Sequence, residues 1–149
     1  MLTVLCGLPG SGKTTWRQAQ AADAAAVCLD DIRGELTGDA GCQRYNDNVM
    51  MVAIGRIRDA LEDGRDVIID ATNLTAASRA LWVELAEECD QPARCVYFPI
   101  PLAVALTRNT GRDRQVPDSA MLRMGRRLEV PRTSEGFDQV LVMPQGENR

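Results

Sequence analysis

Short runs of consecutive apolar residues alternate along this chain with longer segments in which apolar positions recur every three or four residues. A run of about five apolar residues is typical of a strand buried on both faces, whereas the three- and four-residue spacing is typical of an amphipathic helix. The pattern predicts strands at 2–6, 25–29, 66–70, 93–98 and 139–143. It predicts helices at 14–22, 32–37, 45–63, 75–89, 101–109 and 117–128, with a polar tail after the last strand.

The regular alternation of strands and helices predicts the fold class. Such an order calls for an α/β fold in which a mostly parallel, five-stranded sheet is flanked by helices on both faces. The sequence shows no internal repeat and no linker long enough to divide domains, so we expect residues 1–149 to form a single domain.

The residues Gly7 to Thr14 read GLPGSGKT and match the phosphate-binding pattern G-x-x-x-x-G-K-[ST], between a predicted strand and a predicted helix. Glycines let the backbone turn its N–H groups onto phosphate, and the helix N-terminus adds positive potential. We expect Lys13, the only lysine, to contact the β- and γ-phosphates of ATP and the Thr14 hydroxyl to bind Mg²⁺. The nucleotide-binding residues expected here are Gly10, Ser11, Gly12, Lys13, Thr14 and Thr15.

The composition narrows the function classes. The 149 residues are 45% hydrophobic and 26% charged, which is ordinary for a soluble globular protein. No apolar run approaches a membrane span and no secretory signal is evident, so we expect a cytoplasmic protein. The five cysteines lack C-x-x-C spacing, which argues against a zinc site or a disulfide framework. Histidine is absent, so a general base has to be a carboxylate.

Charge is unevenly distributed along the chain. The net charge is −4, but residues 108–132 carry seven arginines against three acids. A patch of that sign can hold polyphosphate on an otherwise acidic protein. For Arg123, Arg126 and Arg127, a solvated helix face is the alternative interpretation.

Acidic residues follow two of the predicted strands, where ligands bind in such a sheet. Asp30 and Asp31 come directly after the second strand. One of them can accept the proton of an attacking hydroxyl, and Arg33 is spaced to hold an anionic acceptor. Alternatively, both acids cap the helix that follows.

Asp70 ends the third strand in the apolar-apolar-apolar-Asp pattern of an acid that binds Mg²⁺ through water or supports Thr14. Its alternative role is a strand-end acid that caps a turn.

Arg108 and Arg112 lie four residues apart around a predicted helix end. This spacing predicts a lid over about 108–116 whose guanidinium groups neutralise phosphate charge.

The motifs occur in one order: GLPGSGKTTW, DDIR at Asp30–Arg33, ATNL at Ala71–Leu74, RNTGR at Arg108–Arg112, and QVP with MLRM through Met124. Together they resemble the kinase domain of phage-type polynucleotide 5′-kinases over about residues 2–130. The resemblance implies a P-loop kinase fold with an Arg-rich lid. It also implies transfer of the γ-phosphate of ATP to the 5′-hydroxyl end of DNA or RNA, with Mg²⁺.

The resemblance also implies roles for individual residues. Asp30 corresponds to the general base, and Arg33 to the contact with the 3′-phosphate of the terminal nucleotide. Thr72 and Asn73 match a Thr-Asn pair on the acceptor side. The donor site corresponds to Lys13, Thr14, Arg108 and Arg112.

Two departures from the phage pattern are visible. Ala71 stands where that pattern often carries an acid, so either Asp70 takes over this role or the acceptor site differs. The phosphatase motif D-x-D-x-T, which some phage enzymes carry, does not occur, so we expect a kinase without phosphatase activity. Two other functions remain open: a small-molecule kinase for a nucleoside, sugar or sugar nucleotide, and a non-catalytic ATP-binding module.

Overall fold

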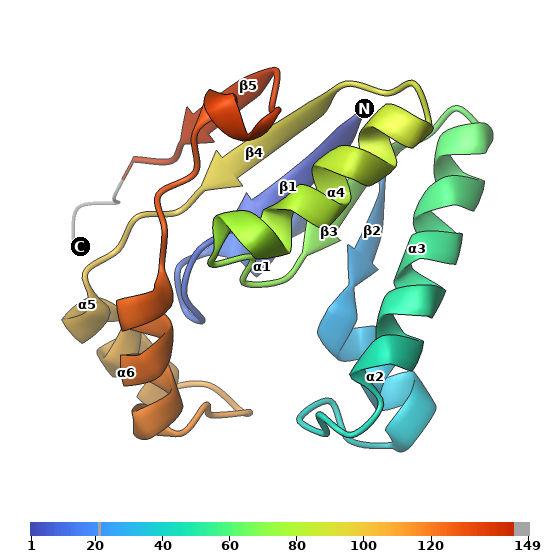
Figure 1. Ribbon diagram of the computed structural model, residues 1–149. Helices are drawn as coiled ribbons and strands as arrows, with labels where there is room; N and C mark the ends of the chain where they lie inside the picture. The colour runs from blue at the N-terminus through green and yellow to red at the C-terminus, as the bar shows by residue number, and fades with distance from the viewer. Residues whose placement is uncertain (21, 145–149) are drawn as a thin grey trace.

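The computed structural model describes residues 1–20 and 22–144, which build a sheet of five strands and its covering helices (Figure 1). The strands are β1 (Leu2–Cys6), β2 (Ala24–Cys28), β3 (Asp66–Asp70), β4 (Ala93–Tyr97) and β5 (Gln139–Val142). The helices are α1 (Lys13–Gln20), α2 (Leu29–Thr37), α3 (Asn46–Glu62), α4 (Ala76–Glu88), α5 (Leu102–Thr110) and α6 (Asp118–Arg127), with a 3₁₀ turn, η1 (Thr133–Glu135).

The sheet has the strand order β2-β3-β1-β4-β5, and all four strand pairings in the described chain are parallel. In the register of the centre, Val4 lies opposite Ile69 of β3 and Cys95 of β4. Parallel pairing brings the carboxyl ends of all five strands to one edge. The predicted α/β fold with a mostly parallel five-stranded sheet is therefore confirmed.

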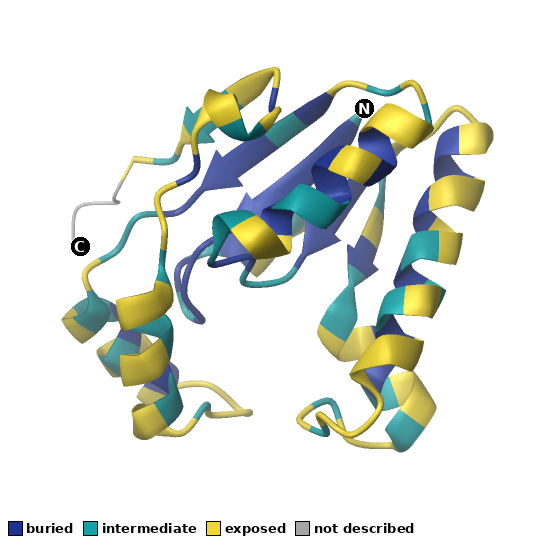
Figure 2. Cartoon of the chain, in the orientation of Figure 1, coloured by how far each residue is buried: buried dark blue, intermediate teal, exposed yellow. Residues whose placement is uncertain are grey.

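Helices cover both faces of the sheet, which explains why its strands are continuous apolar runs. Leu2 and Val4 face a core shared with α3 and α4, whereas Leu5 faces the opposite side, where Trp16 of α1 packs. Trp16 meets Phe98 edge to face, with ring centroids 6.2 Å apart. Figure 2 shows the central strands buried and the outward sides of α3, α5 and α6 exposed.

The predicted elements agree with the observed ones to within about three residues, and the largest difference is at α2. The sequence predicts that this helix begins at Ile32, but it begins at Leu29, with Cys28 as an N-cap that makes no side-chain capping bond. Asp30 and Asp31 therefore lie inside the first helical turn and do not cap it as N-cap residues. Acids in the first turn are favoured by the helix dipole. Ala21, at the end of the first predicted helix, and the polar tail from residue 145 lie outside the described residues.

Thr75 is the N-cap of α4, and it forms reciprocal hydrogen bonds with Ser78. Its side chain accepts from the Ser78 amide, and the Ser78 hydroxyl accepts from the Thr75 amide at 3.2 Å. This reciprocal capping box fixes where α4 begins, directly after the 71–74 loop at the edge of the sheet.

A buried ion pair ties α4 to the segment before β5. The Arg79 side chain is fully buried, and its Nε and Nη2 atoms each donate to Glu135 of η1 at 2.7 Å. Its Nη1 atom donates to the backbone oxygen of Asn73 at 2.9 Å. The sequence did not predict η1 or this ion pair.

Among the helices of residues 1–20 and 22–144, none is long and apolar enough to cross a membrane.

Replacing Glu135 tests the contribution of the buried ion pair to stability. Glu135→Ala leaves the Arg79 charge without its carboxylate in the core, so we expect the free energy of unfolding to fall by about 3 kcal/mol or more. Urea unfolding followed by circular dichroism measures it. The matched control is Glu88→Ala, because Glu88 pairs with Arg58 at the surface, where both side chains are about half exposed. The control should lose less than about 1 kcal/mol, and equal losses would contradict the assignment.

Candidate active site

The loop between β1 and α1 has the backbone geometry of an anion cradle. Gly10 and Gly12 have φ angles of 81° and 99°, in the left-handed region that favours glycine. A Cβ atom on Gly10 would lie 3.3 Å from the Cβ of Arg108, so the loop and α5 approach each other closely here. Arg108 Nη1 also donates to the Gly10 backbone oxygen at 3.3 Å. The phosphate loop and the predicted lid are therefore in direct contact.

Lys13 is a buried ammonium group that the loop itself holds. It is only 7% exposed, and its Nζ donates to the backbone oxygens of Gly7 and Leu8, both at 2.8 Å. None of the ion pairs among the described residues joins Lys13 to a carboxylate. A buried cation held only by neutral oxygens is suited to an incoming anion, so Lys13 fits the phosphates of ATP.

The pKa of Lys13 shows which other charges surround it. Burial lowers this pKa to about 8, because it removes water from the ammonium group. The attraction of Asp70, and more weakly of Asp30, opposes that shift, and the repulsion of Arg112 adds to it. Residues from β3, α2 and the predicted lid thus all act on one ammonium group.

Asp70 lies at the end of β3 and points toward α1. Its Oδ2 atom is 3.2 Å from Nε of Arg17, and its side chain is 8% exposed. Burial raises the pKa of Asp70, while Arg17 and Lys13 act in the opposite direction. No sequence motif indicates Arg17, although its position four residues after Lys13 places both on one face of α1.

Thr14 and Asp70 are the oxygen donors predicted for Mg²⁺, and oxygen ligands suit this ion. Thr14 lies exposed in the first turn of α1, directly after the phosphate loop. Because Asp70 is already paired with Arg17, it fits contact through water better than direct ligation. Its role at a metal stays a prediction.

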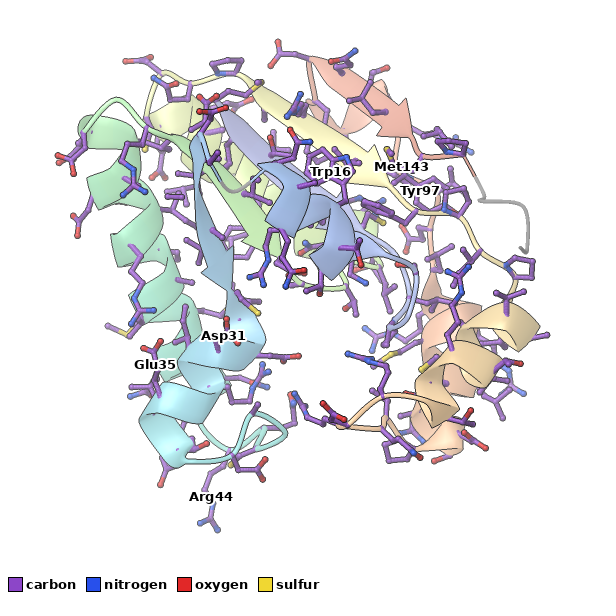
Figure 3. The ribbon with its side chains drawn as sticks, turned by 180° about the vertical axis from the view of Figure 1, so that it is seen from behind. Trp16, Asp31, Glu35, Arg44, Tyr97 and Met143 are labelled. Carbon is purple, nitrogen blue, oxygen red and sulfur yellow. The ribbon has the colours of Figure 1, made fainter. Side chains whose placement is uncertain are left out.

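Asp30 and Arg33 form a second charged group, at the end of β2. Arg33 Nη1 is 2.6 Å from Asp30 Oδ1, and Arg33 Nη2 donates to Asn46 of α3 at 3.2 Å. Asp30 is exposed, whereas Arg33 is buried and its Nε has no hydrogen-bond partner among the described residues. An unsatisfied buried donor beside an exposed carboxylate is an arrangement that an anionic ligand or water completes. Asp31, also at the start of α2 (Figure 3), lies 4.0 Å from Arg17.

The predicted lid begins in the last turn of α5, where Arg108 lies, and Arg112 follows just beyond the helix. Asn109, between them in the sequence, is buried and closes the loop by two bonds to Val116, one from its Nδ2 and one to its Oδ1. Arg114 reaches from this loop to Asp30, with 3.3 Å between Nη1 and Oδ2. Neither Asn109 nor Arg114 was predicted to make these contacts, because nothing in their spacing along the sequence indicates them.

Thr72 and Asn73 differ in their hydrogen-bond partners, and therefore in whether they can contact an acceptor. The Thr72 backbone oxygen accepts from the Gly7 amide at 3.0 Å, which ties the 71–74 loop to the phosphate loop. Asn73 is buried, donates from Nδ2 to the Leu5 oxygen and accepts from the Trp82 indole. Its side chain faces the core and not an acceptor, so we correct the prediction of an acceptor contact for Asn73. Thr72 stays a prediction on the acceptor side.

The sheet order and the phosphate loop together define an α/β P-loop kinase fold. The AAA_33 family, described as an AAA domain, matches residues 2–131. The chain therefore belongs to this family.

Individual relatives are similar over almost the whole chain. The bifunctional polynucleotide phosphatase/kinase of Schizosaccharomyces pombe is 28% identical over 151 residues, 96% of this chain and 33% of that protein. The L-seryl-tRNA(Sec) kinase of Methanococcus maripaludis is 29% identical over 143 residues, 93% of this chain and 56% of that protein. A chain in the structure of the Pnkp1/Rnl/Hen1 RNA repair complex is 26% identical with a TM-score of 0.78, over 92% of this chain and 46% of that one.

These comparisons bear on two predictions. The resemblance to polynucleotide 5′-kinases is confirmed, and the kinase relatives support the prediction of a phosphotransferase. The chain spans about a third to just over half of the length of these curated relatives.

The lowered pKa of Lys13 predicts how ATP binding depends on pH. Only the protonated ammonium attracts phosphate. With a pKa of about 8, Lys13 is mostly a neutral amine in the free protein at higher pH. We expect ATP to bind about tenfold more weakly at pH 9 than at pH 7.5, measured by calorimetry. Lys13→Met should bind more weakly and lose this dependence. A parallel fall in Lys13→Met would assign the dependence to another group.

Proposed function

We propose that this chain is an ATP-dependent polynucleotide 5′-kinase that transfers the γ-phosphate of ATP to a 5′-hydroxyl end of DNA or RNA. The observation that carries the proposal is the exposed Asp30 carboxylate, which forms ion pairs with Arg33 of its own helix and with Arg114 of the predicted lid. A carboxylate at this place can accept a hydroxyl proton, and the buried arginine beside it can hold a phosphate.

The proposed binding site for ATP, the phosphate donor, consists of the phosphate loop and the predicted lid. Backbone amides of Gly10 to Thr15 and the Lys13 ammonium bind the phosphates of ATP, and Arg108 and Arg112 close over them. Arg108 already contacts Gly10 of the loop. Thr14, with Asp70 through water, would hold Mg²⁺, which supplies charge neutralisation at the phosphates. Lys13, Arg108 and Arg112 thus supply positive charge around the transferred group, which stabilises the charge that develops during phosphoryl transfer.

The acceptor side is distinguished by the Asp30–Arg33 pair. Arg33 is fixed by Ala40 and Asn46 in addition to Asp30, and its Nε lacks a partner among the described residues. A neutral sugar or nucleoside offers no anion for this guanidinium, whereas a nucleotide end offers its 3′-phosphate. Arg33 therefore favours a polynucleotide acceptor, with Thr72 nearby on the edge of the phosphate loop.

The proposal extends to the organisation of the protein. We propose one kinase domain over residues 1–149, with a lid over about 108–116, acting in the cytoplasm on nucleic-acid ends in repair. The support is the similarity to a polynucleotide phosphatase/kinase and to a chain of an RNA repair complex. A kinase for another hydroxyl acceptor is the second candidate, because a protein named L-seryl-tRNA(Sec) kinase is equally similar.

Replacing Asp30 tests its role as the general base. Asp30→Asn keeps the shape of the side chain but cannot accept the proton, so we expect kcat for labelling a 5′-hydroxyl oligonucleotide from radioactive ATP to fall about 100-fold or more. ATP binding should be unchanged. Asp31→Asn is the matched control, since Asp31 is the neighbouring exposed acid, and it should retain full activity. Undiminished transfer by Asp30→Asn would remove Asp30 from this role.

A panel of acceptors separates the candidate functions. We expect a 5′-hydroxyl oligonucleotide and a nucleoside 3′-phosphate to be labelled, with kcat/KM about tenfold or more above that for the bare nucleoside, because only the first two carry a phosphate for Arg33. Efficient labelling of a sugar or nucleoside, but not of the oligonucleotide, would favour a small-molecule kinase. Tight ATP binding without transfer to any member would favour a non-catalytic module.

A further inference from the structure

The two oxygens of the Asp30 carboxylate are held by arginines from opposite sides of the site. Arg33 Nη1 lies 2.6 Å from Oδ1, and Arg114 Nη1 lies 3.3 Å from Oδ2. Arg33 belongs to the same helix as Asp30, whereas Arg114 belongs to the loop between α5 and α6. The oxygen that Arg33 leaves free is thus covered by a residue of the lid.

Arg114 also lies against the connection between α2 and α3. A Cβ atom built on Gly41 would lie 3.5 Å from Nη2 of Arg114. In Figure 1 the loop after α5 and the loop after α2 face each other at the lower edge of the molecule. Arg114 therefore bridges the lid and the acceptor side directly over the candidate base.

The two arginine contacts differ in how easily they break. Arg33 has a side chain that is 10% exposed and further bonds to Ala40 and Asn46, so it stays in place. Arg114 and Asp30 are each about half exposed, and an exposed ion pair favours its closed form by only about fivefold or less. A charge-assisted bond from arginine to phosphate is worth about ten- to hundredfold. An incoming phosphate can therefore displace Arg114 from Asp30.

We propose that Arg114 is a latch on the general base, which the phosphate of the acceptor releases. The inference rests on the proposed function and adds to it a source of acceptor selectivity. A polynucleotide end carries a phosphate next to its terminal nucleoside, which draws Arg114 off Oδ2. A bare nucleoside carries none, so Arg114 continues to cover the oxygen that has to receive the proton.

The released oxygen enters the reaction as follows. The 5′-hydroxyl oxygen forms a bond to the γ-phosphorus of ATP, and the bond from this phosphorus to the β,γ-bridging oxygen breaks. ADP leaves with the electron pair of that bond. The hydroxyl proton moves to Oδ2 of Asp30, which needs this oxygen free of Arg114.

Arg114→Gln tests the latch in the complete chain. At saturating ATP, kcat/KM is measured for a 5′-hydroxyl oligonucleotide and for the matching bare nucleoside, and acceptor-independent ATP hydrolysis is measured beside them. We expect the oligonucleotide-to-nucleoside ratio to fall about tenfold or more. Transfer to the nucleoside and hydrolysis should each rise about fivefold, because Asp30 is uncovered. KM for ATP should not change, and Arg114→Lys should restore part of the ratio.

The control is Arg123→Gln, which removes the same charge from an exposed position of α6. An unchanged ratio in Arg114→Gln, or an equal fall in the control, overturns the latch. The latch is also overturned if the ratio falls only because kcat/KM for the oligonucleotide falls, while transfer to the nucleoside and ATP hydrolysis do not rise. In that case Arg114 merely binds phosphate. An intact chain that labels no oligonucleotide overturns the proposed function itself, before any variant is compared.

Discussion

The parallel register of the sheet is the constraint on which the candidate site depends. All five strands end at the same edge, so the phosphate loop after β1, Asp30 after β2 and Asp70 at the end of β3 are brought together from distant parts of the sequence. The charges of Asp70, Asp30 and Arg112 all shift the pKa of Lys13, although these residues come from different segments. No single segment of the chain could create this electrostatic environment.

Cationic side chains outnumber acidic side chains in the candidate site. Asp70 is paired with Arg17, and Asp30 is shared between Arg33 and Arg114. Lys13 is held only by neutral oxygens, namely the backbone oxygens of Gly7 and Leu8 and the Ser11 hydroxyl. A buried nitrogen of Arg33 has no partner in the described chain. An arrangement of this kind is stabilised by anions, and phosphates on both the donor and the acceptor would supply them. Electrostatics thus connects the two halves of the proposed reaction.

Beneath the site, a buried polar network holds the loop that follows β3. Asn73 adopts a left-handed backbone with φ of 44°, and its side chain bonds to Leu5 of β1 and Trp82 of α4. Arg79 bonds the Asn73 backbone and is neutralised by Glu135. The neighbouring Thr72 is thereby fixed against the phosphate loop. Asn73 thus supports the site from the core, and a motif alone does not distinguish such a role from contact with substrate.

The sequence by itself determined the strands, most helix boundaries and the phosphate loop, because these depend on local periodicity and on short motifs. Only the tertiary structure decided which partners the charged residues take. Arg17 with Asp70, Arg114 with Asp30 and Arg79 with Glu135 are 53, 84 and 56 positions apart in the chain, so no local pattern links them. Their pairing depends on which segments the folded sheet brings to the same edge, and this is a property of the packing as a whole.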